Sequence, residues 1–269
     1  RYGLGFVNGY ADMSKEELLK LLYTPTSNRQ FIMYEALRKG ATVEELYELT
    51  KIKQYFIEQM KELVEEEEKI LSYKGKMLPA DMLKTAKLDG FADRYLSKLL
   101  EIPEEDIRAE REKLGIVEAW EGVHVSSTKD SAYYYSSYHM EDKSPASSNK
   151  NKIMILGGGP NRIGQGIEFD YCCVHAAKAL KKLGFETIIV NCNPETVSTD
   201  YDTSDKLYFE PLTMEDVLSI YHKEKPLGVI AQFGGQTPLN LAAGLKKAGV
   251  NILGTTPETI DLAEDRDLF

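Results

Sequence analysis

The sequence predicts an α plus α/β protein, in which an all-helical region is followed by an open parallel sheet. Helix-capping patterns recur before residue 117, and short β-favouring runs alternate with helical patterns after residue 151. The stretch between them, residues 141–151, is charged and rich in Ser and has no periodicity, which is typical of a linker. We therefore expect two domains, residues 1–150 and 151–269.

The composition fits a two-domain protein without nucleic-acid or membrane surfaces. Hydrophobic residues make up 42% of the chain, and the net charge of −10 argues against a nucleic-acid partner. No run approaches the roughly 20 apolar residues of a membrane span, and no signal-peptide pattern opens the chain. Cys172, Cys173 and Cys192 lack metal-ligand spacing, so we expect no metal site and a cytoplasmic protein. The chain lacks an initiating Met and ends inside a predicted helix, which indicates a fragment.

The first region is predicted to be a helical bundle. Capping boxes start helices at Ser14, Ser27 and Thr42, and an apolar stripe runs along residues 52–71. Further helices fit residues 81–88, 92–100 and 103–114. This region contains no cluster of reactive side chains, and by itself it is typical of an interaction module.

The second region alternates strands with helices. Strands fit residues 152–156, 186–191, 206–209, 228–232 and 251–253, and helices fit residues 168–183, 213–223 and 238–248. Right-handed crossovers then give an open, parallel, Rossmann-like sheet. Ligands should gather at the carboxyl ends of its strands, where we expect the loops of Gly157, Asn193 and Gly234 to converge.

A glycine-rich loop links the first strand to its helix. Glycine lets backbone N–H groups approach an anion, and the helix N-terminus that follows carries partial positive charge. We expect the anion-facing groups to come from this loop and from a second glycine loop: Gly157, Gly158, Gly159, Arg162, Gly164, Gly234, Gly235 and Gln236. The alternative is that the glycines only make tight turns.

Two other functions remain open from the residues alone. A dinucleotide-dependent dehydrogenase would need a third glycine where Arg162 stands and an acid after the second strand, where Asn191 stands. A non-enzymatic assembly module would fit residues 1–150.

Three motifs in order resemble the large subunit of carbamoyl phosphate synthetase. They are residues 157–171, 190–205 and 234–238, and they resemble the start of its second synthetase half, a pre-ATP-grasp domain. Residues 24–40, 91–93 and 133–138 resemble, more loosely, the oligomerisation domain that precedes this half. Residues 123–128 depart from the family pattern.

The resemblance implies an enzyme that makes carbamoyl phosphate from bicarbonate, two ATP, and ammonia that a glutaminase small subunit releases from glutamine. It also implies self-association through the helical domain. The family's ATP, Mg or Mn and catalytic residues lie in ATP-grasp segments that match nothing here. We therefore expect no catalytic residue and no bound cofactor in this chain, and no activity from the chain alone.

Two carboxylates near the glycine loops have more than one interpretation. By residue type, Glu168 fits a helix cap and Glu195 a solvated loop, although paired acids could also handle protons or bind an amino-bearing intermediate. The resemblance implies that positions matching Gly166, Glu168 and Glu195 border the passage that delivers carbamate to the second half. We predict these three as passage-lining residues, with Gly166 important because it is small.

Overall fold

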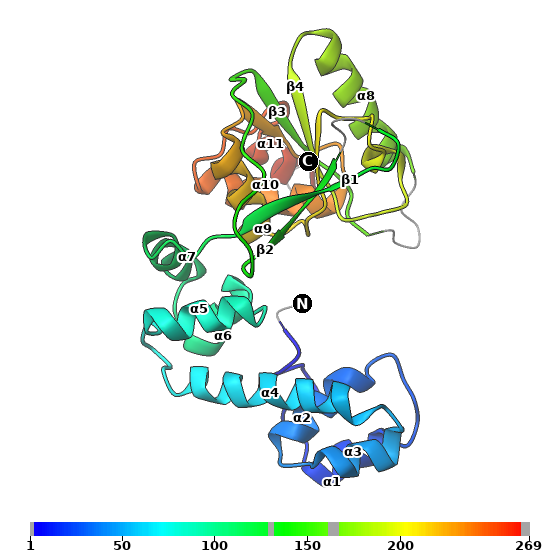
Figure 1. Cartoon of the computed structure of the whole chain (residues 1–269), viewed down its shortest axis with the longest axis vertical. Helices are drawn as coiled ribbons and strands as arrows, with labels where there is room; N and C mark the ends of the chain where they lie inside the picture. Colours follow the sequence, from blue (N-terminus) through cyan, green and yellow to red (C-terminus); the bar gives the residue numbers. More distant parts are fainter. Residues whose placement is uncertain (1–2, 129–131, 161–166, 265–269) are drawn as a thin grey trace. The chain divides into compact units, whose positions relative to one another are not determined.

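The computed structural model describes residues 3–128, 132–160 and 167–264, with the side chain of residue 132 excepted. The chain divides into two compact units, Arg1–Ile116 and Val117–Phe269, drawn in blue to teal and in green to red in Figure 1. The division lies at residue 116, whereas linker composition placed it near residue 150. Residues 117–150 thus belong with the sheet. In the described part of the chain, no helix combines the length and apolarity that a membrane span requires.

The first unit is helical throughout its described elements. These are α1 (Lys15–Leu21), α2 (Arg29–Arg38), α3 (Val43–Thr50), α4 (Gln54–Leu71), α5 (Ala80–Leu88), α6 (Asp93–Leu100) and α7 (Glu104–Lys113). The capping boxes at Ser14 and Thr42 are confirmed, with both reciprocal hydrogen bonds formed. The capping box predicted at Ser27 does not form. Asn28 has already turned to helical backbone angles and caps α2 without a side-chain bond.

Helix α4 joins two hydrophobic clusters of this unit. Ile57 and Val64 pack with α1, α2 and α3, whereas Ile70 packs with α5, α6 and α7. Leu63 contacts both clusters from one side of the helix. The apolar stripe predicted along residues 52–71 therefore serves two cores.

Buried charges reinforce the same helices. Glu35 and Glu67 are fully buried, and Arg38 pairs with both, at 3.2 Å from Nε to Oε2 of Glu35. The hydroxyls of Tyr34 and Tyr95 donate to Glu67 Oε2 at 2.8 and 2.7 Å. A second cluster surrounds the fully buried carboxylate of Asp93, which receives Lys87 Nζ at 2.9 Å and Arg111 Nε at 2.8 Å. In both clusters the buried carboxylate meets a cation, which offsets the cost of its desolvation.

The second unit contains a six-stranded sheet in the order β1-β2-β5-β4-β3-β6. Its strands are β1 (Ala119–His124), β2 (Ala132–Ser137), β3 (Lys152–Leu156), β4 (Glu186–Val190), β5 (Lys206–Tyr208) and β6 (Gly228–Ile230). All neighbours are parallel except β1 and β2, which form an antiparallel hairpin. The predicted open parallel sheet is confirmed, and the hairpin extends it at the β5 side.

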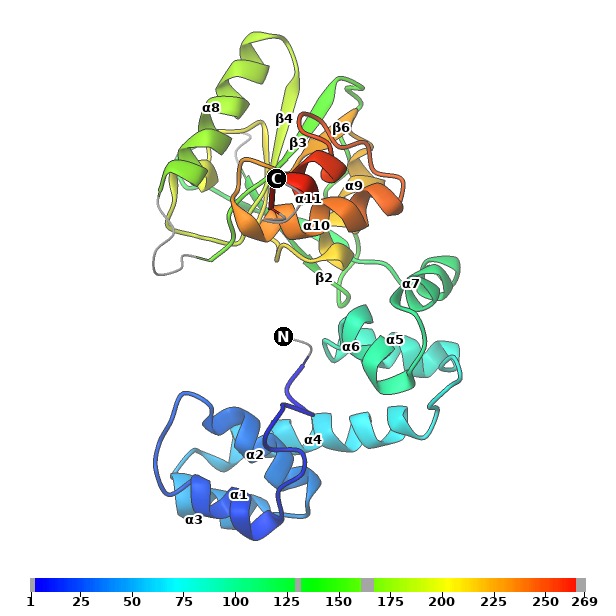
Figure 2. The ribbon, with the colours of Figure 1, turned by 180° about the vertical axis from the view of Figure 1, so that it is seen from behind.

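Helices cover both faces of the sheet. Alternate residues of β3 and β4 point to opposite faces: Ile155 and Ile189 pack with α8 (Glu168–Lys182), whereas Met154 and Ile188 pack with α9 (Met214–Glu224) and α10 (Gln236–Lys247). Figure 2 shows α8 on one side and α9 and α10 on the other. Strands buried on both faces must be apolar at every position, as the run from Ile153 to Leu156 is.

Three local expectations in this unit were wrong. Residues 132–137, which we expected in the helical region, form β2, which pairs with β1 in the hairpin and with β5 in the sheet. The expected strand at 251–253 is a single bridge between Ile252 and Val229. Helix α10 begins at Gln236 with Gly235 as its cap, two residues before the predicted Pro start.

A charged cluster closes the amino edge of the sheet. Lys152 and Lys206, the first residues of β3 and β5, reach Glu224 at 3.0 and 2.5 Å. The hydroxyl of Tyr208 also donates to this carboxylate. Burial alone would raise the pKa of Glu224, but the bonds from Lys206 and Tyr208 outweigh it and hold the pKa below its ordinary value. The amino edge is therefore a charge-paired part of the scaffold.

Candidate functional site

Three loops meet at the carboxyl edge of the sheet. They follow β3 (residues 157–160), β4 (191–196) and β6 (231–235), and we call them the three-loop junction. Because β3 pairs in parallel with both β4 and β6, the loops leave the sheet at the same edge. This is the edge at which open α/β sheets bind ligands.

Glycines let the three loops approach at backbone distance. A Cβ on Gly234 would lie 2.4 Å from the carbonyl oxygen of Gly157 and 2.6 Å from that of Leu156. A Cβ on Gly157 would lie 2.5 Å from Cγ of Asn191. A side chain at Gly234 would force backbone apart, and one at Gly157 would displace the buried Asn191 side chain, so both glycines are required for contact between the loops. The predicted convergence at Gly157 and Gly234 is present in the structure.

Asn191 joins the first two loops through its side-chain amide. It is 1% exposed, and its Oδ1 accepts the N–H of Gly159 at 3.0 Å. Its Nδ2 donates to Oγ of Ser198 at 3.1 Å. One buried amide thus fixes the glycine loop against the segment that follows β4.

Asp170 continues this connection into α8. The Ser198 N–H donates to Oδ2 of Asp170 at 2.9 Å, and Ser198 lies in the short 3-10 turn η1 (Val197–Thr199) that packs against α8. Asp170 is 9% exposed, and its other oxygen, Oδ1, is buried with no hydrogen-bond partner among the described residues. The carboxylate therefore makes one defined link and keeps one acceptor unused.

The two predicted passage carboxylates lie beside this link. Glu168 is the first residue of α8 and Glu195 lies in the loop after β4, and both are exposed. The N–H of Glu195 donates to Oδ1 of Asn193 at 3.1 Å, which fixes the local turn. Both segments are at the carboxyl edge, and the bond between Asp170 and Ser198 connects them.

The remaining predicted residues divide into three groups. Gly158 is half-buried and Gly235 is buried with a φ of +79° that suits glycine. The Gln236 amide is held by Asn240 and Glu264 at 3.0 and 2.9 Å. Outside the described residues lie Arg162, Gly164 and Gly166.

Two domain families match this chain. A sequence-family model for the "Carbamoyl-phosphate synthetase large chain, oligomerisation domain" matches residues 1–115. A model for the "Carbamoyl phosphate synthase preATP-grasp domain" matches residues 149–262. The chain belongs to the carbamoyl phosphate synthase large-chain family.

Relatives named carbamoyl phosphate synthase large chain match throughout the sequence. The protein from Archaeoglobus fulgidus is 50% identical over 276 residues, which is 100% of this chain and 26% of the relative. That from Pseudomonas aeruginosa is 50% identical and covers 96% of this chain and 24% of the relative. That from Halomonas eurihalina is 54% identical over 90% of this chain and 23% of the relative. The chain thus spans about a quarter of the length of these synthase large chains.

Dinucleotide, thiol and metal chemistry have little support among the described residues. The N–H groups of Gly157 and Gly159 are already bonded, to Val190 O at 2.9 Å and to Asn191, so neither is available to a dinucleotide pyrophosphate. Burial raises the pKa of the Cys192 thiol above its ordinary value, which keeps the thiol neutral and unreactive. Among the described residues, no group of three or more His, Cys, Asp or Glu side chains could hold a metal ion.

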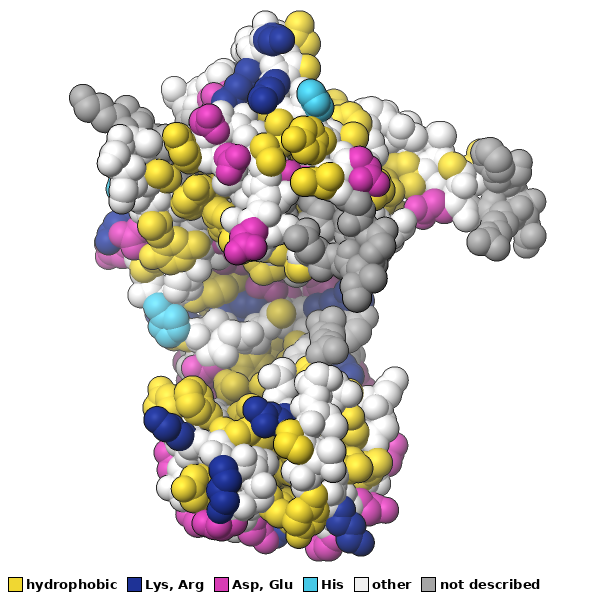
Figure 3. Space-filling model, turned by 90° about the vertical axis from the view of Figure 1, so that its right-hand side faces the viewer, with side chains coloured by type: hydrophobic (Ala, Val, Ile, Leu, Met, Phe, Trp, Pro, Cys, Tyr) yellow, Lys and Arg dark blue, Asp and Glu magenta, His cyan; other side chains and the backbone are white. Residues whose placement is uncertain are grey.

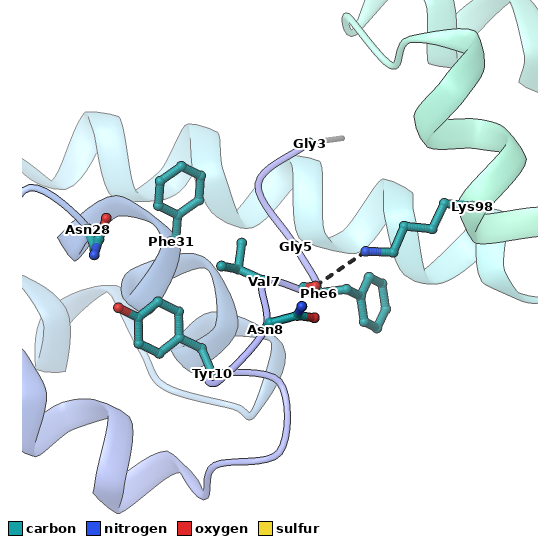
Figure 4. Close-up of a pocket in the computed structure, with 9 residues that line it drawn as sticks. All are labelled: Gly3, Gly5, Phe6, Val7, Asn8, Tyr10, Asn28, Phe31 and Lys98. Carbon is teal, nitrogen blue, oxygen red and sulfur yellow. Dashed lines mark hydrogen bonds between the residues drawn. The ribbon is translucent and has the colours of Figure 1, made fainter. Parts of the chain in front are cut away.

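A hollow in the helical unit is lined mainly by apolar side chains and backbone, unlike the three-loop junction. It has a volume of about 420 Å³ and lies beneath the N-terminal segment, between Gly3, Val7 and Phe31. Figure 4 shows Lys98 reaching this segment, and its Nζ donates to the carbonyl oxygen of Phe6 at 3.3 Å. On the face shown in Figure 3, basic and acidic side chains are interspersed in both units.

Sequence reasoning missed the buried link of Asn191, Ser198 and Asp170. Asn191 was noticed only because it is not an acid. A useful signal was present, because a polar residue directly after a fully apolar parallel strand must find partners at the sheet edge.

Proposed function

We propose that the chain is the central part of a glutamine-hydrolysing carbamoyl phosphate synthase large chain. The whole enzyme makes carbamoyl phosphate from bicarbonate, ammonia and two ATP. The helical unit contributes self-association, and the sheet unit borders the passage that brings carbamate to the second phosphorylation site. Both domain matches, in this order along the chain, support the assignment.

The three-loop junction is the observation that carries the passage. It places the segments of Glu168 and Glu195 at one sheet edge, with both carboxylates exposed. Carboxylates accept hydrogen bonds from the amino group of carbamate or from the hydroxyl of carbamic acid, and they bind no nucleotide phosphate. Gly166 is proposed as the third lining residue, and it lies outside the described residues.

The remaining requirements are met by other parts of the proposed enzyme. ATP and Mg or Mn bind in ATP-grasp segments outside this chain, and a glutaminase small subunit supplies ammonia. The product serves arginine or pyrimidine biosynthesis in the cytoplasm. The catalytic residues of both phosphorylations lie outside residues 1–269.

The test uses the full-length synthase with its small subunit and the variant Glu195→Ala. Because Glu195 is exposed, the substitution should leave the fold intact. We expect glutamine-dependent synthesis to fall by about tenfold and the ATP consumed per carbamoyl phosphate to rise above two. Bicarbonate-dependent ATP hydrolysis and ATP formation from carbamoyl phosphate and ADP should persist, since each uses one active site alone.

Asp202→Asn provides the matched control. Asp202 is also an exposed acid in the second unit, and we assign it no place in the passage. It should leave both synthesis and ATP consumption unchanged. If the Glu195→Ala enzyme still consumed two ATP per carbamoyl phosphate, Glu195 would not line a carbamate passage and that part of the proposal would be rejected.

A further inference from the structure

We propose that Asp170 is a positioning residue, which sets the spacing of the two passage carboxylates through its bond to Ser198. This inference rests on the passage proposed above. It assigns a role to a residue that does not itself line the route.

The bond connects the two glutamate-bearing segments by short, rigid routes. Glu168 lies two residues before Asp170 on α8, a hydrogen-bonded helix of 15 residues. Glu195 lies three residues before Ser198, in a loop whose internal bonds leave it little freedom. Fixing Asp170 against Ser198 therefore fixes the backbone of one glutamate relative to that of the other.

Internal bonds make the loop after β4 rigid. Thr199 Oγ1 donates to the carbonyl oxygen of Asn193 at 2.9 Å, and the N–H of Glu195 donates to Oδ1 of the same Asn193. Asn193 and Thr199 are 7% and 3% exposed, so these bonds are screened from water. Displacing Ser198 would therefore displace Glu195 as well.

Asn191 extends the same connection to the glycine loop. The bonds run from the Gly159 N–H to Asn191, from Asn191 to Ser198 Oγ, and from the Ser198 N–H to Asp170. These groups are buried, and hydrogen bonds in such surroundings hold geometry more firmly than bonds exposed to water. The bonds thus connect the glycine loop, the segment after β4 and α8 to one another.

The presence of a carboxylate at position 170 supports a positioning role over simple packing. Asp170 is the third residue of α8, where the helix N-terminus stabilises a carboxylate. Its Oδ1 nevertheless remains buried without a partner among the described residues, which costs free energy. A residue that served only the core would be more stable as an apolar side chain, so the acceptor at Oδ2 is the feature that the junction uses.

The experiment compares Asp170→Ala with Asp170→Asn in the full-length synthase with its small subunit. The alanine removes the acceptor, whereas the asparagine keeps an oxygen that can accept the Ser198 N–H. For Asp170→Ala we expect the ATP consumed per carbamoyl phosphate to rise, with synthesis reduced about tenfold while both single-site reactions persist. Asp170→Asn should restore coupling to within about twofold of the parent enzyme, because it keeps the hydrogen bond.

Each remaining outcome decides the proposal. Unchanged coupling in Asp170→Ala would overturn it, and so would equal uncoupling in both variants, since charge and not position would then matter. If Asp170→Ala fails to fold, Asp170→Leu replaces it, because leucine fills a similar volume and offers no acceptor to the Ser198 N–H, and it should raise the ATP ratio in the same way. Unchanged coupling there would also overturn the proposal. Uncoupling by Glu195→Ala without any effect at Asp170 leaves the passage standing and rejects the positioning role alone.

Discussion

The two units bury polar groups in different ways. In the helical unit, the buried carboxylates of Glu67 and Asp93 each meet a cation and further donors. At the three-loop junction, Asp170 keeps an oxygen without a partner among the described residues, and Glu168 and Glu195 are exposed. Saturated carboxylates are scaffold, because every bond they can make is made within the protein. Unsaturated ones mark the edge at which the chain can act on something else.

The sheet unit contains both saturated and unsaturated carboxylates. The contrast is therefore not one between a helical fold and a sheet fold. At its amino edge, Glu224 is saturated by Lys152, Lys206 and Tyr208. The junction lies at the opposite ends of the same strands, and neutral groups such as Asn191 hold it together. Among the described residues, one edge of the sheet is thus charge-paired and the other has carboxylate oxygens without a partner.

The largest expected effect comes from breaking a saturated cluster. Arg38→Met would leave Glu35 and Glu67 buried without their shared cation. We expect the free energy of unfolding of the helical unit to fall by about 4 kcal/mol, measured by urea titration. Adding Glu67→Gln should recover part of this loss, because it removes one of the uncompensated charges.

The control for Arg38 is Lys61→Met. The pair of Lys61 with Glu65 spans 3.8 Å at the surface, with both side chains more than half exposed. Exposed pairs contribute little, so the stability should hardly change. Equal effects at Arg38 and Lys61 would contradict the scaffold role of the buried cluster.

A glycine substitution tests whether the loops of the junction must contact each other through backbone. It adds a methyl group and changes no charge. Gly234→Ala would place a Cβ against the backbone oxygens of Gly157 and Leu156, which cannot rotate away. We expect a loss of about 3 kcal/mol from the sheet unit, measured by urea unfolding.

Gly244→Ala is the matched control on α10. Its Cβ would meet only the flexible side chain of Met214, at 3.1 Å. Alanine also favours a helix interior, so we expect no loss and a gain of up to about 1 kcal/mol. A Gly234→Ala protein as stable as Gly244→Ala would show that the loops do not need backbone contact.

Sequence reasoning succeeded where the signal is local. The caps at Ser14 and Thr42 bond to residues three positions away, and the strand at Ile153 is apolar at each position. It failed where partners are distant: the β1–β2 hairpin depends on pairing with β5, some 74 residues from Tyr133 to Leu207. The link from Gly159 to Asn191 likewise spans 32 positions. The sequence indicates which glycines and glutamates to consider, but the bonds that hold them depend on which loops the sheet brings together.

Glu210 offers the smallest and most specific test of the comparison. It follows β5 at the carboxyl edge and is 5% exposed, and its Oε1 has no partner among the described residues. Burial, with repulsion from Asp216 and Glu118, raises the pKa of Glu210 to about 7, although Ser136 donates a bond that lowers it. The folded protein therefore holds a proton that the unfolded chain releases near its ordinary pKa of about 4.5. Stability should fall as the pH rises from about 4.5 to 7 and then level off.

The variant Glu210→Gln should remove this dependence, because an amide does not titrate. Between pH 5 and pH 8 the parent chain should lose about 2 kcal/mol more than the variant in the free energy of unfolding of the sheet unit. Asp202→Asn, at an exposed acid of the same unit, should keep the parent profile. If Glu210→Gln and the parent have parallel profiles, Glu210 is ionised in the folded protein. Its buried oxygen would then have a donor, and it would belong with Glu67 and Glu224 among the saturated carboxylates.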